Sequence, residues 1–546
     1  MDLLDLPPEL VLACLAQLSL SDIRSCLAAR NRLFSVIILT SAAIRYRFEQ
    51  EHAGVVANAH RSPQPPASDG LRELRAREAN WLHFTPSSRH TTPFGFPTAS
   101  IYDLAADVYL VGDVADPSTS LCTTIKYIST DPGSSWVRIE VGKPIVDFGT
   151  ALEEHDLIAM VTYTRHPDDA EMAALEVVLL QFSTGARHPL AAIPILHVHD
   201  VDVDRGRPAI SIEIVGAVLA ISVLYWMDPR RDRDSLHLFY WQTGVRPLDP
   251  LMVSNIGLTF LTPEILLVPS ALDQMIDVFR IPQPPSDDDV FSGPYHPSFV
   301  RSLHLPQLNP NKHILSFQCR GEPNPRTRLV RPTTTPFLST PEDSIILFSV
   351  DIGDGEGRSS THMFVVSRAR LAAFLASQEA LEAERRRRLE EADDDSDDEY
   401  DVDTDLNWAE WGVRCARWLD DAGAGTWARG YITTTCGSRM VAIAHDAWSR
   451  PAPIRVLDFN QRRVERVRDG AANSRVRVVD ADAGTVPHQP HVFAEPLTSS
   501  LPYIETVSEE TFPYAAVLIN NSDIIGVKLN VNGDQDVGSL EVLRLG

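Results

Sequence analysis

One short segment near the middle of the chain carries side chains of the types that bind metal ions. Its candidate nitrogen and oxygen donors are His197, His199, Asp200, Asp202 and Asp204. Alternate residues of a strand face the same side, so part of this set could in principle hold a metal ion. The spacing is not that of a calcium-binding loop, because Arg205 stands where such a loop needs glycine. We therefore expect a polar strand edge here and no metal site.

The sequence contains none of the short motifs that mark common nucleotide-binding and hydrolytic sites. The patterns G-x-x-x-x-G-K-[ST], G-x-G-x-x-G, G-x-S-x-G and H-E-x-x-H are all missing. The segment Gly353 to Gly357 is rich in glycine, but it has no lysine to meet a phosphate and is more typical of a hairpin. We therefore predict no catalytic residues and no cofactor.

Two groups of aromatic residues raise the question of a recognition surface. The first comprises Tyr225, Trp226, Tyr240 and Trp241, and the second comprises Trp408, Trp411, Trp418 and Trp427. The first group lies in apolar runs, so we expect it in the core. Exposed tryptophans of the second group would suit a partner, because aromatic anchors dominate interface energies. We favour the alternative that they cover an insertion against a sheet.

The elements that position these residues belong to a folded protein with an acidic surface. The chain has 546 residues, of which 44% are hydrophobic and 23% are charged, which is the balance of a folded protein. Its 74 acidic and 49 basic residues give a net charge of −25. Phosphate groups prefer a basic surface, so we expect neither nucleic acid nor an anionic membrane as a partner.

The start of the chain and its cysteines bear on where the protein is kept. The first five residues lack the basic start and apolar run of a secretory signal, and no later stretch is apolar enough to span a membrane. The six cysteines include no C-x-x-C pair, so neither a disulfide framework nor a zinc site is indicated. We expect an intracellular protein, in the cytoplasm, the nucleus or both.

Residues 1–51 differ from the rest of the chain, because their apolar residues recur at helical spacing. Pro7 and Pro8 suit the first turn of a helix, where Glu9 also suits the helix dipole. Three or four short helices are predicted by three apolar stripes, which contain Leu10, Val11, Cys14, Leu15 and Leu18; Ile23, Cys26 and Leu27; and Leu33, Phe34, Ile37 and Ile38. A unit this small is hard to stabilise alone, so we expect it to lean on the rest of the chain or on a second protein.

These residues resemble the F-box, the adaptor-binding motif of Skp–cullin–F-box ubiquitin ligases. The similarity covers about the first 83 residues and includes Thr40 to Glu49 and Leu71 to Trp81, as in fungal F-box proteins whose helical linker leads into a large β-rich domain. Leu20 stands where the family usually has proline, and Leu33 stands where it often has tryptophan. The resemblance implies that the adaptor is bound through Leu6, Pro7, Leu10, Leu15, Leu18, Ile23, Leu33 and Phe34.

Residues 52–94 are predicted to link the helical unit to the rest of the chain. The stretch from Ser62 to Gly70 is rich in proline and polar residues, which indicates a surface loop. Apolar residues from Leu71 to Leu82 predict a helix near 71–82. A rigid helix here would hold the two parts of the protein at a defined distance.

From residue 95 to 546 a recurring pattern predicts a large all-β domain. An apolar run follows a polar or Asp-containing turn, and after a gap a second run ends in a Thr-Gly-like turn. The clearest copies begin at Asp156 and Gly216, and fainter copies begin near Glu264, Asp343, Ser438 and Asp523. Repeated strand pairs of this kind favour a degenerate β-propeller with six to eight blades. A pair of β-sandwiches is the competing interpretation, because the spacing of the copies is uneven.

An insertion at about 368–407 interrupts this pattern. Leu371, Leu375, Leu381 and Leu389 have helical spacing, and the chain then becomes strongly acidic up to Glu399. We expect a helix followed by a solvated, disordered acidic segment. The alternatives are that the acidic block binds a basic partner, or that the four arginines at 385–388 form a nuclear signal.

The resemblance implies a non-catalytic role in ubiquitin transfer. The helices would dock on the Skp adaptor, and through it on cullin, while the β domain would bind an unknown protein substrate. Two other functions stay open: a propeller enzyme that acts at its central channel with the helices as a lid, and a scaffolding interaction protein that is independent of cullin.

Overall fold

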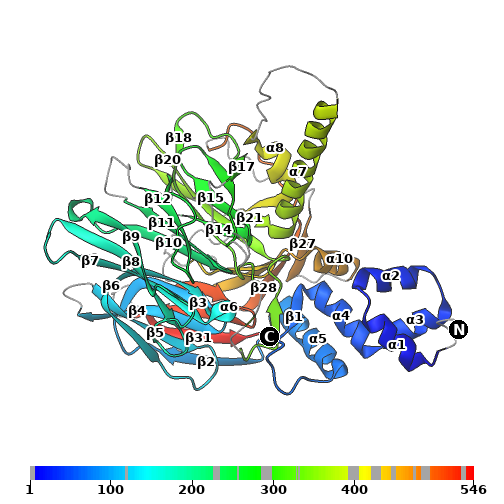
Figure 1. Ribbon diagram of the computed structural model, residues 1–546. Helices are drawn as coiled ribbons and strands as arrows, with labels where there is room; N and C mark the ends of the chain where they lie inside the picture. Colours follow the sequence, from blue (N-terminus) through cyan, green and yellow to red (C-terminus); the bar gives the residue numbers. More distant parts are fainter. Residues whose placement is uncertain are drawn as a thin grey trace.

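The computed structural model describes most of the chain. The described residues are 6–116, 121–225, 234–254, 257–284, 298–326, 329, 333–391, 405–419, 432–443, 451–470, 475–480, 492–530 and 537–546. They form a helical N-terminal part and a much larger part built from antiparallel sheets (Figure 1). The β-rich character predicted for the chain beyond residue 95 is confirmed.

Five helices make up the N-terminal part. They are α1 (Pro8–Ala16), α2 (Leu20–Ala28), α3 (Arg32–Thr40), α4 (Ala42–Ala53) and α5 (Ala67–His83). The side chains of Ser19 and Ser41 accept hydrogen bonds from backbone N–H groups in the first turns of α2 and α4, as helix-capping residues do. Gly54 ends α4 in a left-handed conformation with a φ of 62°, which glycine adopts without strain.

The strands form six sheets of four to seven strands and one small pair. The first sheet contains β3 (Thr98–Ala105), β4 (Val108–Asp116), β5 (Leu121–Ser129), β6 (Val137–Ala151), β7 (Leu157–Arg165), β8 (Met172–Gln181) and β9 (Ile195–Asp202), and the second contains β10 (Ala209–Val215), β11 (Val218–Leu224), β12 (Ser235–Tyr240) and β13 (Leu251–Met252). The third contains β14 (Thr259–Thr262), β15 (Ile265–Ser270), β16 (Met275–Arg280), β17 (Ser298–His304) and β22 (Asp405–Leu406), and the fourth contains β18 (Lys312–Arg320), β20 (Ile345–Asp354), β21 (Ser359–Ser367) and β23 (Ala416–Leu419). The fifth contains β24 (Thr435–Cys436), β25 (Arg439–Ile443), β26 (Ala452–Asp458), β28 (Tyr503–Phe512) and β27 (Val476–Val479), and the sixth contains β29 (Ala516–Ile519), β30 (Asp523–Leu529), β31 (Val537–Arg544) and β2 (Ser88–Pro93). The pair is β1 (Val55–Ala57) with β19 (Phe337–Ser339).

The long strand β6 belongs to two groups of strands. Its first part pairs with β5, and its last part pairs with β7. The seven-stranded sheet is thus two groups of four that share β6. With this division, the sheets supply seven groups of antiparallel strands.

Seven apolar cores join these groups in a closed cycle. Each core takes its strand residues from two groups that follow each other along the chain. The last core joins β29–β31 to β3–β5, so the final group packs on the first. The N-terminal strand β2, which falls inside the segment predicted as a linker, pairs with β31 near the C-terminus and completes that final group.

The sequence repeats mark the same position in six of these groups. The predicted copies coincide with β7, β11, β15, β20, β25 and β30, and each of these is the second strand of its group. The Thr-Gly turns are also equivalent: the N–H groups of Gly185 and Gly244 both donate at 2.8 Å to the carbonyl four residues earlier, and both glycines have positive φ. The repeat is therefore a strand-turn-strand unit.

The predicted insertion is only partly separate from the sheets. Helix α7 (Arg368–Glu391) is present, but Leu371, Phe374 and Leu375 in its first turns belong to a core with β18, β20 and β21. The apolar side of these turns therefore covers the sheet, so the start of the predicted insertion is part of the β-rich core. The acidic block lies outside the described residues.

Within the described ranges, three further α-helices lie among the strands. They are α6 (Leu152–His155), α8 (Trp408–Cys415) and α10 (Gln461–Asp469). Trp408, Trp411 and Trp418 are buried, as are Tyr225, Tyr240 and Trp241, so the described members of both aromatic groups belong to the core as expected. Trp226 and Trp427 lie outside the described residues.

All six cysteines are free thiols. Among the described helices, none has the length and apolar content needed to cross a membrane.

Candidate functional site

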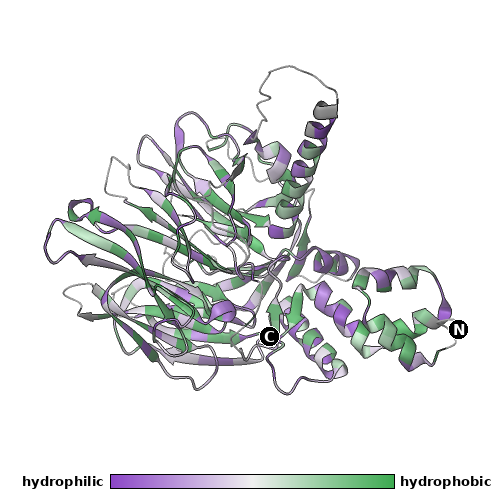
Figure 2. Cartoon of the chain, viewed as in Figure 1, coloured by the Kyte–Doolittle hydropathy of each residue, from purple (hydrophilic) through white to green (hydrophobic). Residues whose placement is uncertain are grey.

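Helices α1 and α3 present an apolar face to solvent. Leu10 is 52% exposed, Val36 is 51% exposed and Leu39 is 62% exposed. We call these three residues the apolar face. Much of the ribbon of the helices near the N-terminus is coloured hydrophobic (Figure 2). Exposed groups of large apolar side chains mark interaction sites more often than scattered single residues do.

The structure divides the eight residues predicted to bind an adaptor. Pro7 and Leu10 are exposed, and Leu6, Leu18 and Phe34 are half-buried. Leu15 and Ile23 are corrected: both are buried in the core of the helical unit, so neither can contact a partner while the unit is folded. The side chain of Leu33 is outside the described part.

Sequence reasoning missed two members of the apolar face. Val36 and Leu39 are three positions apart on α3, which places them on one side of the helix. Ile37 and Ile38, on the other side, are the buried ones. The signal was present in the sequence as a helix that is apolar around most of its circumference, since such a helix needs a second surface to cover it.

The core of the helical unit is local. Its described members, both the buried residues and the half-buried ones packed on them, all lie between Leu6 and Phe48. In Figure 1 the helices α1, α2 and α3 project from one side of the sheets and are joined to them through α4 and α5. The apolar face therefore stays free of the β-rich part.

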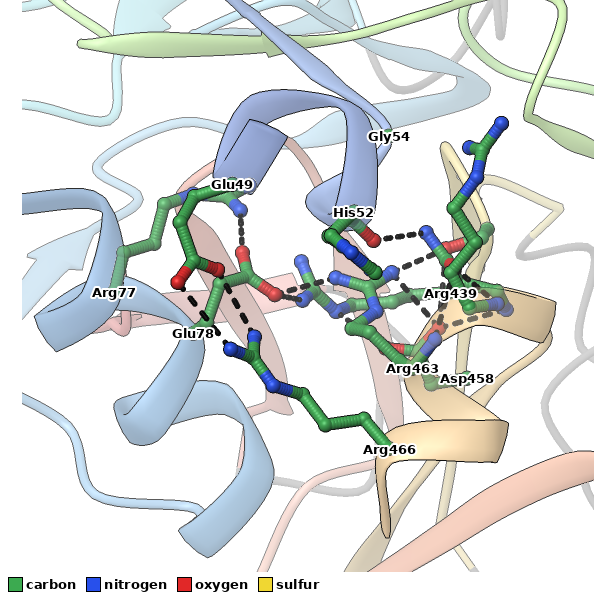
Figure 3. A network of polar contacts seen from close by, with 12 residues as sticks. Glu49, His52, Gly54, Arg77, Glu78, Arg439, Asp458, Arg463 and Arg466 are labelled. Carbon is green, nitrogen blue, oxygen red and sulfur yellow. Dashed lines mark hydrogen bonds and ion pairs between the residues drawn. The ribbon is translucent and has the colours of Figure 1, made fainter. Parts of the chain in front are cut away.

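A polar network fixes α5 to the β-rich part (Figure 3). The Glu78 carboxylate on α5 accepts hydrogen bonds from Arg77, from Arg439 on β25 at 2.6 Å and from Arg463 on α10. Burial alone would raise the pKa of Glu78, but these three guanidinium groups together hold it well below its usual range. Asp458 accepts from Arg439 at 3.1 Å and from Arg463 at 2.9 Å, which closes the network.

Helix α4 is attached by a second set of contacts. Glu49 accepts hydrogen bonds from Arg75 on α5 at 2.7 Å and from Arg466 on α10 at 2.9 Å. The side-chain amide of Asn460 donates to the carbonyl of His52 at 3.0 Å. Since α4 and α5 both bond to α10, the helical unit is held in a defined position on the sheets.

A second candidate site lies where the first strands of several groups meet. Arg320 on β18 bonds to Asp103 at 2.8 Å, to Glu322 at 2.8 Å and to Glu213 at 3.3 Å. Two cavities adjoin this cluster, with volumes of about 70 and 270 Å³. Both are lined by Asp103, Ile212 and Arg320. Three carboxylates thus converge on one guanidinium.

The carboxyl groups of this cluster have altered acidity. Burial raises the pKa of Glu322 to about 8; Arg320 opposes the rise, and the carboxylates of Glu213 and Asp103 add to it. Burial also raises the pKa of Asp147, which lines the larger cavity, to about 7. Carboxyl groups with such pKa values can exchange protons near neutral pH, which is the property that acid–base catalysis uses.

Side chains of the segment that carries the candidate metal donors have other partners. The two ring nitrogens of His199 lie 3.0 Å from the Tyr225 hydroxyl and 3.3 Å from a ring nitrogen of His237. The Asp200 carboxylate lies 3.0 Å from His166. Within the described residues, no group of three or more His, Cys, Asp or Glu side chains is placed to hold a metal ion.

No protein-family model matches the chain, and no curated protein matches it. Among solved structures, the WD40 domain of SCAP from fission yeast is similar at 7% identity and a TM-score of 0.29, over 81% of this chain and 82% of that chain. The β-propeller domain of Cps50 (Swd1) from Myceliophteria thermophila has 10% identity and a TM-score of 0.24, over 52% and 85%. A luciferin-regenerating enzyme has 8% identity and a TM-score of 0.27, over 79% and 100%. Since similarities this weak carry no functional argument, function must be argued from the residues of this chain.

Proposed function

We propose that this protein is the substrate-recognition subunit of a Skp–cullin–F-box ubiquitin ligase. Helices α1 to α3 dock on the Skp adaptor, and the β-rich part binds the protein that receives ubiquitin. The observation that carries the proposal is the exposed apolar face of Leu10, Val36 and Leu39, which is left uncovered by the described residues of the β-rich part. Burying such side chains against a partner is favourable by about 25 cal/mol for each Å² of apolar area.

The attachment of the helical unit supports the same proposal. A substrate receptor has to hold its target at a fixed distance from the adaptor. The networks around Glu78 and Glu49 attach α5 and α4 to the sheets through charged hydrogen bonds, and bonds of this type are stronger than those between neutral groups. A firm connection between the two parts suits the transfer of ubiquitin to one region of a bound target.

The arrangement of the sheets defines the other half of the proposal. We propose that the β-rich part is a degenerate β-propeller of seven blades, each blade being one of the seven groups of strands. Two features support this: the closed cycle of seven cores, and the pairing of β2 with β31, which joins the start and the end of the domain. The loops of such a domain vary without loss of the sheets, which suits target binding.

Co-purification tests the proposal. The full chain is expressed together with a Skp adaptor and a cullin and is recovered through a tag on this chain. We expect a stable complex of all three proteins. Recovery of the chain without the adaptor, at micromolar concentrations of both, contradicts the proposal. Adaptor binding without cullin recruitment would instead favour a scaffolding protein that is independent of cullin.

The cluster around Arg320 supports one other function, an enzyme that acts at the centre of the ring. Its carboxyl groups have the proton-exchange property described above. The lid that this hypothesis assigned to the helices is not supported by the geometry, because the residues lining the two cavities come from positions 100 to 432 and include none from α1 to α5. We therefore keep this function as the second candidate.

A further inference from the structure

A cavity lies at the joint between the helical unit and the β-rich part. Its volume is about 300 Å³, and α4, α5, α10, β26 and β28 all contribute to its wall. The apolar portion of the wall is made by Leu74, Trp81, Leu82, Val456, Val467 and Ile504. This volume is at the lower end of the range for small-molecule sites, which are typically apolar with a few placed polar groups.

The described charged groups around this cavity leave an excess of positive charge. Four guanidinium groups line it, those of Arg75, Arg439, Arg463 and Arg466, against three carboxylates, those of Glu49, Glu78 and Asp458. His52 also lines the cavity, and burial lowers the pKa of its imidazole, which is therefore neutral at pH 7. The surplus of positive charge favours the binding of an anionic ligand.

The surplus is placed where a ligand from solvent could reach it. The side chains of Arg75 and Arg466 are 48% and 63% exposed, and both bond to Glu49, which is only 12% exposed. One carboxylate between two guanidinium groups leaves one positive charge unbalanced on the outer side of the cavity. An anionic head group could bind there while an apolar body enters the cavity.

One buried donor in the wall also lacks an acceptor. Trp81 is 98% buried, and its indole N–H has no hydrogen-bond partner among the described residues. A buried donor without a partner is unfavourable by about 1 to 3 kcal/mol. The Arg439 guanidinium lies 4.8 Å from the centre of the Trp81 ring, so positive charge reaches the inner wall as well.

We propose that this cavity binds an organic anion with an apolar body, of the chemical class of a medium-chain carboxylic acid. The carboxylate bonds to Arg466 and Arg75, and the hydrocarbon contacts Leu82, Val467 and Ile504. Such a ligand would touch α5 and β28 at once, because both line the cavity. This inference is independent of adaptor binding, since the apolar face is on α1 and α3.

Calorimetric titration of the full chain with octanoate at pH 7 tests the proposal, with 1-octanol as the uncharged probe. We expect saturable binding of one octanoate, and binding of 1-octanol that is weaker by about tenfold or more, because the uncharged alcohol forms no ion pair with the guanidinium groups. Absence of saturable octanoate binding, or equal binding of the two probes, overturns the proposal.

Two variants separate the apolar body from the head group. Ala79→Trp fills the cavity from the exposed side of α5, and Arg466→Gln removes the surplus charge while Arg75 still pairs with Glu49. Each should weaken octanoate binding about tenfold.

Ala76→Trp, at an exposed position on α5 that does not line the cavity, is the control and should bind octanoate as the wild type does. Equal weakening by Ala79→Trp and Ala76→Trp, or unchanged binding by both test variants, contradicts the site. Co-purification of the Ala79→Trp variant with the adaptor should be unchanged, which keeps this test apart from the proposed function.

Discussion

The carboxylate of Glu78 and the guanidinium of Arg439 form a 2.6 Å hydrogen bond between residues that are 361 positions apart. Glu78 lies on α5, and Arg439 lies on β25 in the penultimate group of strands. Arg463 on α10 donates to the same carboxylate. The bond therefore connects α5, the last of the five N-terminal helices, to a sheet near the end of the chain, and it helps to fix the direction in which the apolar face points.

Replacement of Glu78 by glutamine should destabilise this joint. The change leaves three guanidinium groups around an uncharged amide, and removal of one partner from a buried ion pair lowers the free energy of unfolding by about 3 kcal/mol. Guanidinium chloride denaturation, followed by tryptophan fluorescence, measures the effect. Glu384→Gln, which removes the exposed pair with Arg388 on α7, is the matched control and should change stability by less than about 0.5 kcal/mol. Equal stability of the Glu78→Gln variant and the wild type would show that the network is not a structural link.

The fold could be predicted from the sequence where local chemistry determines it. The copy that begins at Asp156 is an example. The Asp156 carboxylate accepts a hydrogen bond from the Ser183 backbone N–H at 3.1 Å, and Gly185 takes the positive φ of the turn. Aspartate, the turn glycine and two apolar runs are all visible in one short window of sequence. The equivalent strand of the remaining group, β4, was missed: Asp107 precedes its apolar run, but no Thr-Gly turn follows the next strand, β5.

The candidate sites could not be predicted in the same way, because long-range contacts create them. Asp103, Glu213 and Arg320 meet at one point, yet they come from three groups of strands. Their individual segments look like ordinary strands with one polar residue. The assignment of Leu15 and Ile23 to an interface failed for a related reason: helical spacing shows that residues share a side, but it does not show which side meets the neighbouring helix.

Arg368 should be essential for stability although it lies at the start of the predicted insertion. It is almost fully buried, and its guanidinium donates to the Ser344 hydroxyl at 2.9 Å and to backbone carbonyls in two other segments, those of Phe260 and Gly321. Burial lowers the pKa of this guanidinium to about 10, so it stays charged at neutral pH. Arg368→Ala should lower the free energy of unfolding by about 3 kcal/mol, because buried acceptors lose a charged donor.

The control for Arg368 lies on the same helix. Arg385→Ala alters an exposed arginine of α7 and should change stability by less than about 0.5 kcal/mol. Thermal and denaturant unfolding of both variants give the comparison. Equal stability of the two variants would show that the buried contacts of Arg368 do not stabilise the attachment of α7 to the sheets.

Glu322 should make stability depend on pH. Its folded-state pKa of about 8 lies above the ordinary value of 4.5, so the folded protein binds a proton that the unfolded chain releases. Stability from this group is therefore fully present below pH 4.5 and falls as the pH rises towards 8. Glu322→Gln cannot ionise, so the variant should be more stable than the wild type at pH 8 and similar to it at pH 4. Denaturation midpoints across this range provide the measurement, and parallel curves for the two proteins would show that Glu322 titrates normally.

The apolar face gives the sharpest test of the proposed adaptor contact. Leu10→Lys combined with Leu39→Lys places two charges where apolar side chains would be buried, and loss of two central anchors should weaken adaptor binding at least about 100-fold. Both positions are more than half exposed in the free protein, so the double variant should fold and unfold as the wild type does. Leu381→Lys on α7, at a leucine that is 60% exposed, is the matched control and should bind the adaptor normally. A double variant with wild-type affinity would remove α1 and α3 from the interface, and loss of binding by the Leu381 control would place the contact on the other side of the molecule.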